Sequence, residues 1–286
     1  MSGLWTRMVL VAGVAVAGLG GGRDAGANER HFTYTYETAT LPAGTIELEP
    51  WTTVRMQHED YFVGTDHRLE FEVGITDRLQ SALYLNLSAL AAEEKGVTTS
   101  AFAYEGFAWE TKWKLMDPVA DAVGLGLYFE LGVEPDAVSI EAKLLIDKRI
   151  GAFNLAFNAV VEPEFSHEKD DTELEELEIE ADLALGYFIT DNFSIGLEIR
   201  NHNEMAKGHE EAGMAGMEMA GEEGDLEFEH SVLFAGPVIS YAADRWWAAL
   251  TVLPQIAALS GASKDSILDL EGHERVETRL ILGMHL

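Results

Sequence analysis

Acidic side chains recur at every second position in several stretches of the chain. The clearest run is Glu176, Glu178, Glu180 and Asp182, which alternates with apolar residues. In an extended strand, alternate side chains share one face, so these four carboxylates are expected on a single surface. Burying such a row in a dry protein core costs free energy, whereas the same row is stable where it faces water. Around a water-filled path, it favours cations and disfavours anions.

Several other stretches repeat this polar face with acids in excess over bases. The charged residues predicted to line an ion path are Glu70, Glu72, Glu110, Lys112, Glu130, Glu141, Lys143, Glu176, Glu178, Glu180, Asp182, Glu198, Arg200, Glu277 and Arg279. A simpler interpretation is that these charges fill a barrel interior with ion pairs, because a barrel of modest size has limited room. Both interpretations place the side chains inside, and the sequence leaves them open.

A second group of candidate ligands lies in and beside the longest polar stretch, residues 203–225. Its imidazole and thioether donors are His202, Met205, His209, Met214, Met217 and Met219. Thioether sulfur and imidazole nitrogen together suit copper, so copper is a candidate partner at this loop. The alternative is a flexible acidic loop in which the methionines are incidental. The lack of cysteine and of a repeated spacing favours that alternative.

Catalysis finds less support in the sequence. A nucleophile site needs Ser or Thr beside a base and an orienting acid, and no Gly-x-Ser-x-Gly segment occurs. The chain has no cysteine, which excludes thiol catalysis, disulfides and cysteine-ligated zinc. A site assembled from separate strands would leave no such motif, so a barrel hydrolase stays a second alternative. We expect that the protein is not an enzyme and that it uses no cofactor.

Long alternating strands must position these residues. From Val138 to Ile146 every second residue is apolar, and after a break at residues 148–151 the alternation resumes from Phe153 to Val161. Two such strands joined by so short a connection predict an antiparallel hairpin. Each strand is about ten residues long, the length that a tilted strand needs to cross a bilayer, whereas soluble strands usually have about five or six.

The rest of the chain repeats this pattern. Short turns at residues 76–78, 116–118, 190–192 and 243–245 alternate with longer polar loops. An even number of strands with short turns on one side and long loops on the other is typical of bacterial outer-membrane barrels. We therefore predict an all-β fold, a transmembrane antiparallel up-and-down β-barrel of about 12 strands, over residues 45–286. Residues 28–44 are expected to form a leader segment before it.

Residues 1–27 have the features of a signal peptide. Arg7 precedes an apolar core at residues 8–20, and Ala25-Gly26-Ala27 supplies a cleavage site of small residues. No later stretch approaches the roughly 18 apolar residues of a membrane helix, and an exported chain that spans a bilayer without helices needs a closed barrel. The formal charge of -31 argues against nucleic acid as a partner. The expected surroundings are the lipids of the bacterial outer membrane. Aromatic girdles at the membrane interfaces are expected to include Trp109, Trp113, Trp246 and Trp247.

Four segments resemble a known group of barrels: Gly74 to Leu83, Trp109 to Pro118 (WETKWKLMDP), Gly124 to Glu130 (GLGLYFE) and Ile140 to Ile146 (IEAKLLI). They are similar to poorly characterised outer-membrane barrels grouped with transporters near the phenol meta-pathway channel proteins. The resemblance covers roughly residues 45–200. It implies a fold and a location, but no catalytic residue and no substrate.

These observations together predict a porin-like outer-membrane channel or transporter. Its acidic lumen should favour cations, and its cargo should be small solutes or cations. The first alternative is a copper-handling protein that uses residues 202–230. The second is a barrel hydrolase.

Overall fold

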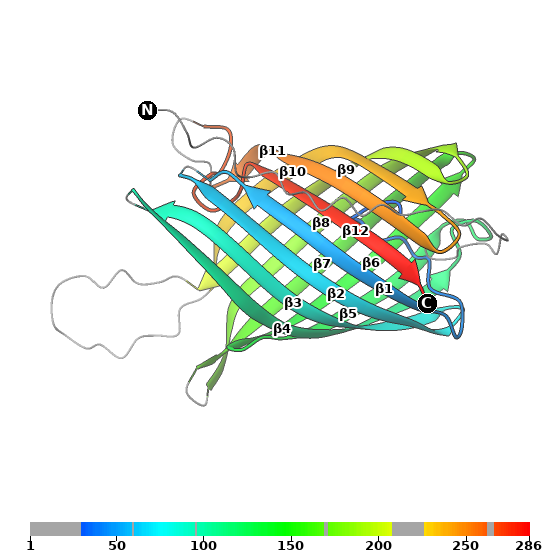
Figure 1. Ribbon diagram of the computed structural model, residues 1–286, viewed down its shortest axis with the longest axis horizontal. Coiled ribbons are helices and arrows are strands. Elements are labelled where there is room, and N and C mark those ends of the chain that lie inside the picture. Colours follow the sequence, from blue (N-terminus) through cyan, green and yellow to red (C-terminus); the bar gives the residue numbers. More distant parts are fainter. Residues whose placement is uncertain (1–29, 59, 95, 169–170, 208–225, 262–265) are drawn as a thin grey trace, which may run out of the picture.

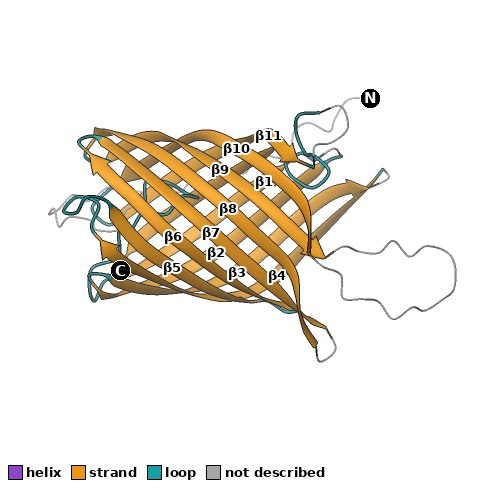
Figure 2. Ribbon diagram, turned by 180° about the vertical axis from the view of Figure 1, so that it is seen from behind, coloured by secondary structure: helices purple, strands orange, loops and turns teal. Residues whose placement is uncertain are grey.

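The computed structural model describes residues 30–58, 60–94, 96–168, 171–207, 226–261 and 266–286. It contains twelve strands in these ranges: β1 (Ile46–Met56), β2 (Phe62–Thr76), β3 (Leu79–Glu94), β4 (Val97–Met116), β5 (Gly124–Val133), β6 (Ala137–Ile150), β7 (Phe153–Glu168), β8 (Asp171–Thr190), β9 (Phe193–Lys207), β10 (Leu226–Ala242), β11 (Trp246–Ser260) and β12 (Val276–His285). Each strand pairs antiparallel with its chain neighbours, and β12 pairs with β1 (Figures 1 and 2). The predicted closed barrel is confirmed.

The barrel wall has an apolar outer face and a polar inner face. On β8, Ile179, Leu183 and Leu185 are more than 40% exposed, whereas Glu180 and Asp182 between them are buried. Every second side chain of a strand points to the same side, so this alternation separates two environments. A water-soluble protein buries its apolar face. An apolar exterior around a charged interior instead fits a barrel surrounded by hydrocarbon.

The two ends of the barrel differ. One end, called the turn end below, carries the short connections at residues 77–78, 117–123, 151–152, 191–192 and 243–245, and both Ile46 and His285 lie there. The opposite end, called the loop end, includes the long connection between β11 and β12. Strands continue further toward the loop end than the sequence pattern indicates. The pair Leu226 with Lys207 extends β9 and β10, so residues 203–207 belong to β9 and not to the longest loop.

The predicted hairpin around residue 150 is present. Ile150 pairs with Phe153 across the two-residue turn 151–152. Gly151 has a φ of 60°, a left-handed backbone conformation that glycine adopts without the clash a Cβ atom would cause. Among the described residues, no helix has the length and apolar character needed to cross a membrane.

The stretch that precedes β1, expected as a leader segment, lies inside the barrel. We call residues 30–45 the luminal segment. Phe32, Thr33 and Leu41 are fully buried although they belong to no strand. The blue ribbon of this segment enters the barrel from the turn end (Figure 1). Residues 31–37 belong to no strand, so their backbone groups have no strand partners. Side chains of the barrel interior form hydrogen bonds with several of these groups, as described below.

Small wall residues make room for the aromatic side chains of the luminal segment. Phe32 packs against Ala156, Ala184 and Val238. A Cβ atom on Gly186 would lie 3.2 Å from the Phe32 ring, tighter than most real contacts. Substituting larger residues at these wall positions would therefore displace the segment.

A second aromatic cluster surrounds Tyr36 and corrects one prediction. Trp247, expected in an aromatic girdle at the membrane interface, is buried in the interior with Tyr36 and Trp51, and its indole N–H donates to Glu47. Trp109 and Trp113 do lie on the outer face, where both are exposed. The pattern at residues 246 and 247 cannot decide the orientation because two adjacent tryptophans must occupy opposite faces of one strand.

Candidate functional site

Glu198 of β9 holds the centre of the luminal segment. Its carboxylate accepts hydrogen bonds from the backbone N–H groups of Thr33 at 3.1 Å, Tyr34 at 2.9 Å and Thr35 at 2.8 Å. Hydrogen bonds to an ionised group are about twice as strong as neutral ones. Three consecutive N–H groups directed at one buried carboxylate form a fixed anchor for the segment.

Three further strands hold the segment. Asn158 of β7 accepts from the N–H of Tyr36 at 2.6 Å and donates to its carbonyl oxygen at 2.9 Å. The hydroxyl of Thr38 donates to Asp147 of β6 at 2.7 Å. Gln80 of β3 accepts from the N–H of Leu41 at 3.0 Å. The segment is thus attached to several sides of the barrel and crosses its interior.

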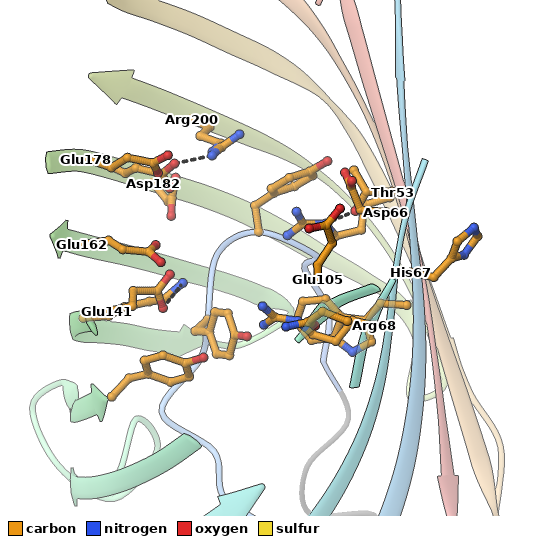
Figure 3. Close-up of a pocket in the computed structure, with 18 of the residues that line it drawn as sticks. Thr53, Asp66, His67, Arg68, Glu105, Glu141, Glu162, Glu178, Asp182 and Arg200 are labelled. Atoms are coloured by element: carbon orange, nitrogen blue, oxygen red, sulfur yellow. Dashed lines mark hydrogen bonds and ion pairs between the residues drawn. The ribbon is translucent and has the colours of Figure 1, made fainter. Parts of the chain in front are cut away.

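Cavities lie on both sides of the luminal segment. Toward the loop end, a cavity of about 310 Å³ has Tyr34 and Tyr36 at its base, and it shares Asp66, Glu178 and Arg200 with a cavity of about 740 Å³ that extends to the loop end. We call these two cavities together the vestibule. Figure 3 shows the pale blue luminal segment curving between the green strands that carry Glu141, Glu162 and Asp182 and the blue strands opposite.

The third cavity, of about 200 Å³, opens near the turns at the other end. Its lining includes His31 and Glu37 of the luminal segment together with Asp147, Arg149 and Asp191 of the barrel. The segment therefore borders both the vestibule and this cavity, and it lies between them. Any solute that passes along the barrel axis must pass this segment.

All predicted path residues point to the barrel interior. The buried ones are Glu70, Glu72, Glu110, Lys112, Glu130, Glu180, Asp182, Glu198 and Glu277, and the partly exposed ones are Glu141, Lys143, Glu176, Glu178, Arg200 and Arg279. Their position inside agrees with the sequence pattern. Their role in conducting ions stays a prediction.

Ion pairs hold several of the interior charges. Arg200 of β9 contacts Glu180 of β8 and lies 3.1 Å from Glu277 of β12. Arg68 contacts Glu130 through both terminal nitrogens, at 3.1 and 3.2 Å. The row of carboxylates on β8 is therefore not uniform. Glu180 forms an ion pair with Arg200, yet Glu178, Glu180 and Asp182 all line the vestibule.

A cluster of acids on β1, β2 and β4 lies beside the luminal segment. Its members are Glu47, Glu49, Glu70, Glu72 and Glu110, and all are buried. Glu47 lies opposite Glu72, and Glu49 lies opposite Glu70 in the register of β1 and β2. Within the described residues, neither oxygen of Glu70 or Glu110 accepts a hydrogen bond. Like charges opposite one another are unfavourable, so a positive charge near this wall reduces the repulsion among the carboxylates.

Arg30 of the luminal segment supplies a positive charge beside this acid cluster. Its charge interacts with those of Glu49 and Glu70, and its guanidinium lies over the Tyr36 ring at 3.9 Å and the Trp51 ring at 4.6 Å. Lys112 adds a second positive charge that interacts with Glu110. Sequence reasoning missed Arg30 as an interior residue because nothing in the chain before β1 signals entry into the lumen.

Two of the six predicted copper ligands, His202 and Met205, lie in the described part of the chain. His202 is a buried residue of β9, and its Nδ1 lies 2.7 Å from Glu180. Met205 lies three positions along the same strand and therefore points to the opposite, outer face. Both residues belong to β9, which continues through them to Lys207, and not to the loop in which the sequence pattern placed Met205. His209, Met214, Met217 and Met219 lie outside the described residues.

Together these features define a closed twelve-stranded barrel with a charged interior that contains an N-terminal segment. The chain belongs to a family described as a family of unknown function (DUF6662), whose profile matches residues 24–286. This agrees with the expected resemblance to poorly characterised barrels. No functionally curated protein matches the chain.

Solved outer-membrane proteins share the fold, among them a channel and a porin. The COG4313 outer membrane channel from Pseudomonas putida F1 is 11% identical, with a TM-score of 0.57, and the match covers 93% of this chain and 100% of that one. The NanC porin structure is 8% identical, with a TM-score of 0.51, and the match covers 84% of this chain and 100% of that one. At these identities the likeness concerns the fold.

Proposed function

We propose that the protein is a bacterial outer-membrane channel for small solutes, with a lumen that favours cations and a luminal segment that closes it. The observation that carries this proposal is the acid-lined vestibule that runs from the loop end to Tyr34 and Tyr36 of the segment. The apolar outer face supports the membrane location. The channel and the porin that share this fold provide further support.

The charges around the vestibule favour cations. Glu105, Glu162 and Glu178 border the cavity, whereas Arg200 and Arg68 are bound to interior carboxylates. A path lined by one sign of charge with low-dielectric walls concentrates counter-ions. The acid cluster on β1, β2 and β4 extends the negative potential to the level of the luminal segment.

The location is tested by fractionation. We expect the mature chain to begin at Asn28, to be recovered with outer membranes and to migrate faster on a gel before heating than after it. The last property reflects a closed barrel whose strands are all paired. Recovery of the folded chain as a periplasmic protein free of lipid would contradict the proposal.

Replacing Glu178 with Gln should reduce cation preference. Its side chain is 30% exposed to the vestibule, where a carboxylate stabilises a nearby cation more strongly at low salt because screening is weaker. We expect the reversal potential in a salt gradient to move toward zero, and to move most at low ionic strength. Asp244→Asn, which removes an acid from the turn between β10 and β11, is the matched control and should have no effect.

The rim of the vestibule should make this preference depend on pH. Glu134 lies in the connection between β5 and β6, where burial and the charges of Glu164, Glu105 and Asp136 raise its pKa to about 7. An acid with a raised pKa is neutral below that value and charged above it. Cation preference should therefore increase between about pH 6 and pH 8. In Glu134→Gln this increase should shrink; an unchanged pH profile would show that other groups cause it.

A further inference from the structure

Three histidines meet at the loop end of the barrel. His202 belongs to β9, His230 to β10, and His273 to the connection between β11 and β12. The His273 ring centroid lies 5.3 Å from that of His202 and 5.3 Å from that of His230, and it meets each ring edge to face. His273 is thus the centre of the group.

Two carboxylates complete the group. One donor atom each from His202, Glu204 and His273 lie within 4.8 Å of one another. The same holds for His230, Asp269 and His273. Donors around one zinc ion at about 2.0–2.2 Å are spaced by roughly 3–3.5 Å, so small side-chain rotations would bring either set to that geometry.

Hydrogen bonds at Nδ1 fix the orientation of Nε2 in two of the rings. Nδ1 of His202 lies 2.7 Å from the Glu180 carboxylate, and Nδ1 of His230 lies 2.6 Å from that of Asp269. In metal sites a histidine ligand almost always donates its other ring N–H to a carboxylate, carbonyl or water, which sets the tautomer and raises the basicity of the free nitrogen. This arrangement leaves Nε2 of both rings for a ligand.

The third ring has a buried nitrogen that lacks a partner. Nε2 of His273 forms no hydrogen bond within the part of the chain that the structure describes, and the residue is only 8% exposed. A buried ring nitrogen without a hydrogen-bond partner is unfavourable unless something binds it.

Two glycines hold the adjacent ring in a close-fitting position. A Cβ atom on Gly272 would lie 2.7 Å from Cε1 of His230, and one on Gly261 would lie 2.9 Å from its Nδ1. Both distances are shorter than real Cβ contacts, so the backbone can approach the ring only because glycine occupies these positions. Gly261 and Gly272 therefore let the backbone pack closely around the His230 ring.

We propose that His202, Glu204 and His273 bind a divalent transition-metal ion, with the His230 and Asp269 pair as the adjacent donors. Imidazole and carboxylate donors without thiolate suit Zn²⁺ and Cu²⁺. His202, Glu204 and His273 line the 740 Å³ cavity, which gives the ion a route from the loop end. The site goes beyond the channel function and needs no ion flow. It uses none of the thioether residues of the polar loop.

Zinc binding by the full-length protein tests the site. The protein is purified in detergent, stripped with a chelator and titrated with Zn²⁺ in competition with a chromophoric chelator. We expect one tightly bound Zn²⁺ per chain, and a loss of at least about tenfold in affinity for His273→Ala, since even second-shell changes weaken metal sites by 10–100-fold. Zn²⁺ is used because thioethers bind it poorly.

His58→Ala is the matched control. His58 lines the same cavity, stacks on Phe62 and lies outside both donor groups. This variant should bind Zn²⁺ like the unmodified protein. Gly272→Ala should weaken binding because it displaces the His230 ring.

Two further measurements distinguish the loss of metal ligands from misfolding. Heat-dependent gel mobility verifies that each variant forms the barrel, and electron paramagnetic resonance of bound Cu²⁺ counts the coordinating nitrogens. We expect coupling to at least two imidazoles, with one fewer in His273→Ala. Equal zinc affinity of folded His273→Ala and His58→Ala, or no stoichiometric binding by the unmodified protein, would overturn the proposal. Neither result would affect the conductance experiments.

Discussion

Deleting residues 30–41 should raise the single-channel conductance by roughly tenfold or more, because ions need an open, water-filled path. The deletion removes the part of the luminal segment that lies between the vestibule and the cavity at the turn end. It leaves every strand intact, including the β1 and β12 pair that closes the barrel. Recordings in planar bilayers measure the change directly.

A replacement variant provides the control for the deletion. Exchanging residues 30–41 for a Gly/Ser sequence of equal length keeps the chain connectivity but removes the hydrogen bonds to Glu198, Asn158 and Gln80. A flexible segment without these anchors should leave the lumen most of the time. Both variants should conduct more than the unmodified protein. Unchanged conductance in two correctly folded variants would show that the luminal segment does not close the path.

Replacing Glu198 with Ala should open the channel without removing any of the segment. The substitution leaves the N–H groups of Thr33, Tyr34 and Thr35 without their acceptor. Hydrogen bonds to charged groups contribute about 1.5–3 kcal/mol each, and water entering from the vestibule will offset part of the loss. We expect the segment to be less stably bound by about 2–4 kcal/mol, which appears as frequent openings.

The matched control for this variant is Glu176→Gln. Glu176 is also an interior acid, but its place on β8 is near the loop end, opposite Ala206 of β9 and away from the luminal segment. It should leave the opening frequency unchanged. If both variants open equally often, the general loss of interior charge, and not the anchor, is responsible.

The barrel wall could be predicted from the sequence because each strand has an apolar environment outside and a polar one inside. Apolar and polar residues therefore alternate along it. Val138 to Val161 shows this well, since both strands and the short turn between them are present at those positions. The strand ends were less predictable. Near the loop end, polar residues such as Lys207 continue the pairing beyond the apolar pattern, and only cross-strand partners reveal this.

The luminal segment could not be predicted in the same way. Residues 31–37 alternate like a strand but are short and polar, and their partners Asn158 and Glu198 lie more than 100 residues away in the chain. Nothing local distinguishes an exposed leader from a segment inside the barrel. The sequence pattern correctly placed Glu198 and Glu180 inside, but it could not show that one binds the segment and the other an arginine.

The histidine group could be predicted only in part, for a related reason. His202 and His230 lie at the two ends of the methionine-rich stretch, whereas Asp269 and His273 follow no recognisable spacing. They meet because β9, β10 and β11 are adjacent in the barrel and the connection to β12 returns over His230. Contacts of this kind depend on strand order and register, which a single sequence does not encode locally.

The reversal potential of the Δ30–41 protein in a salt gradient measures whether the acidic lumen selects cations. With the segment and Arg30 removed, the acids on β1, β2 and β4 border an open lumen, so the proposal predicts a clear preference for cations that weakens as ionic strength rises. The unmodified protein should show the same sign of preference with far smaller currents. A preference for anions, or no preference at low salt, would contradict the account.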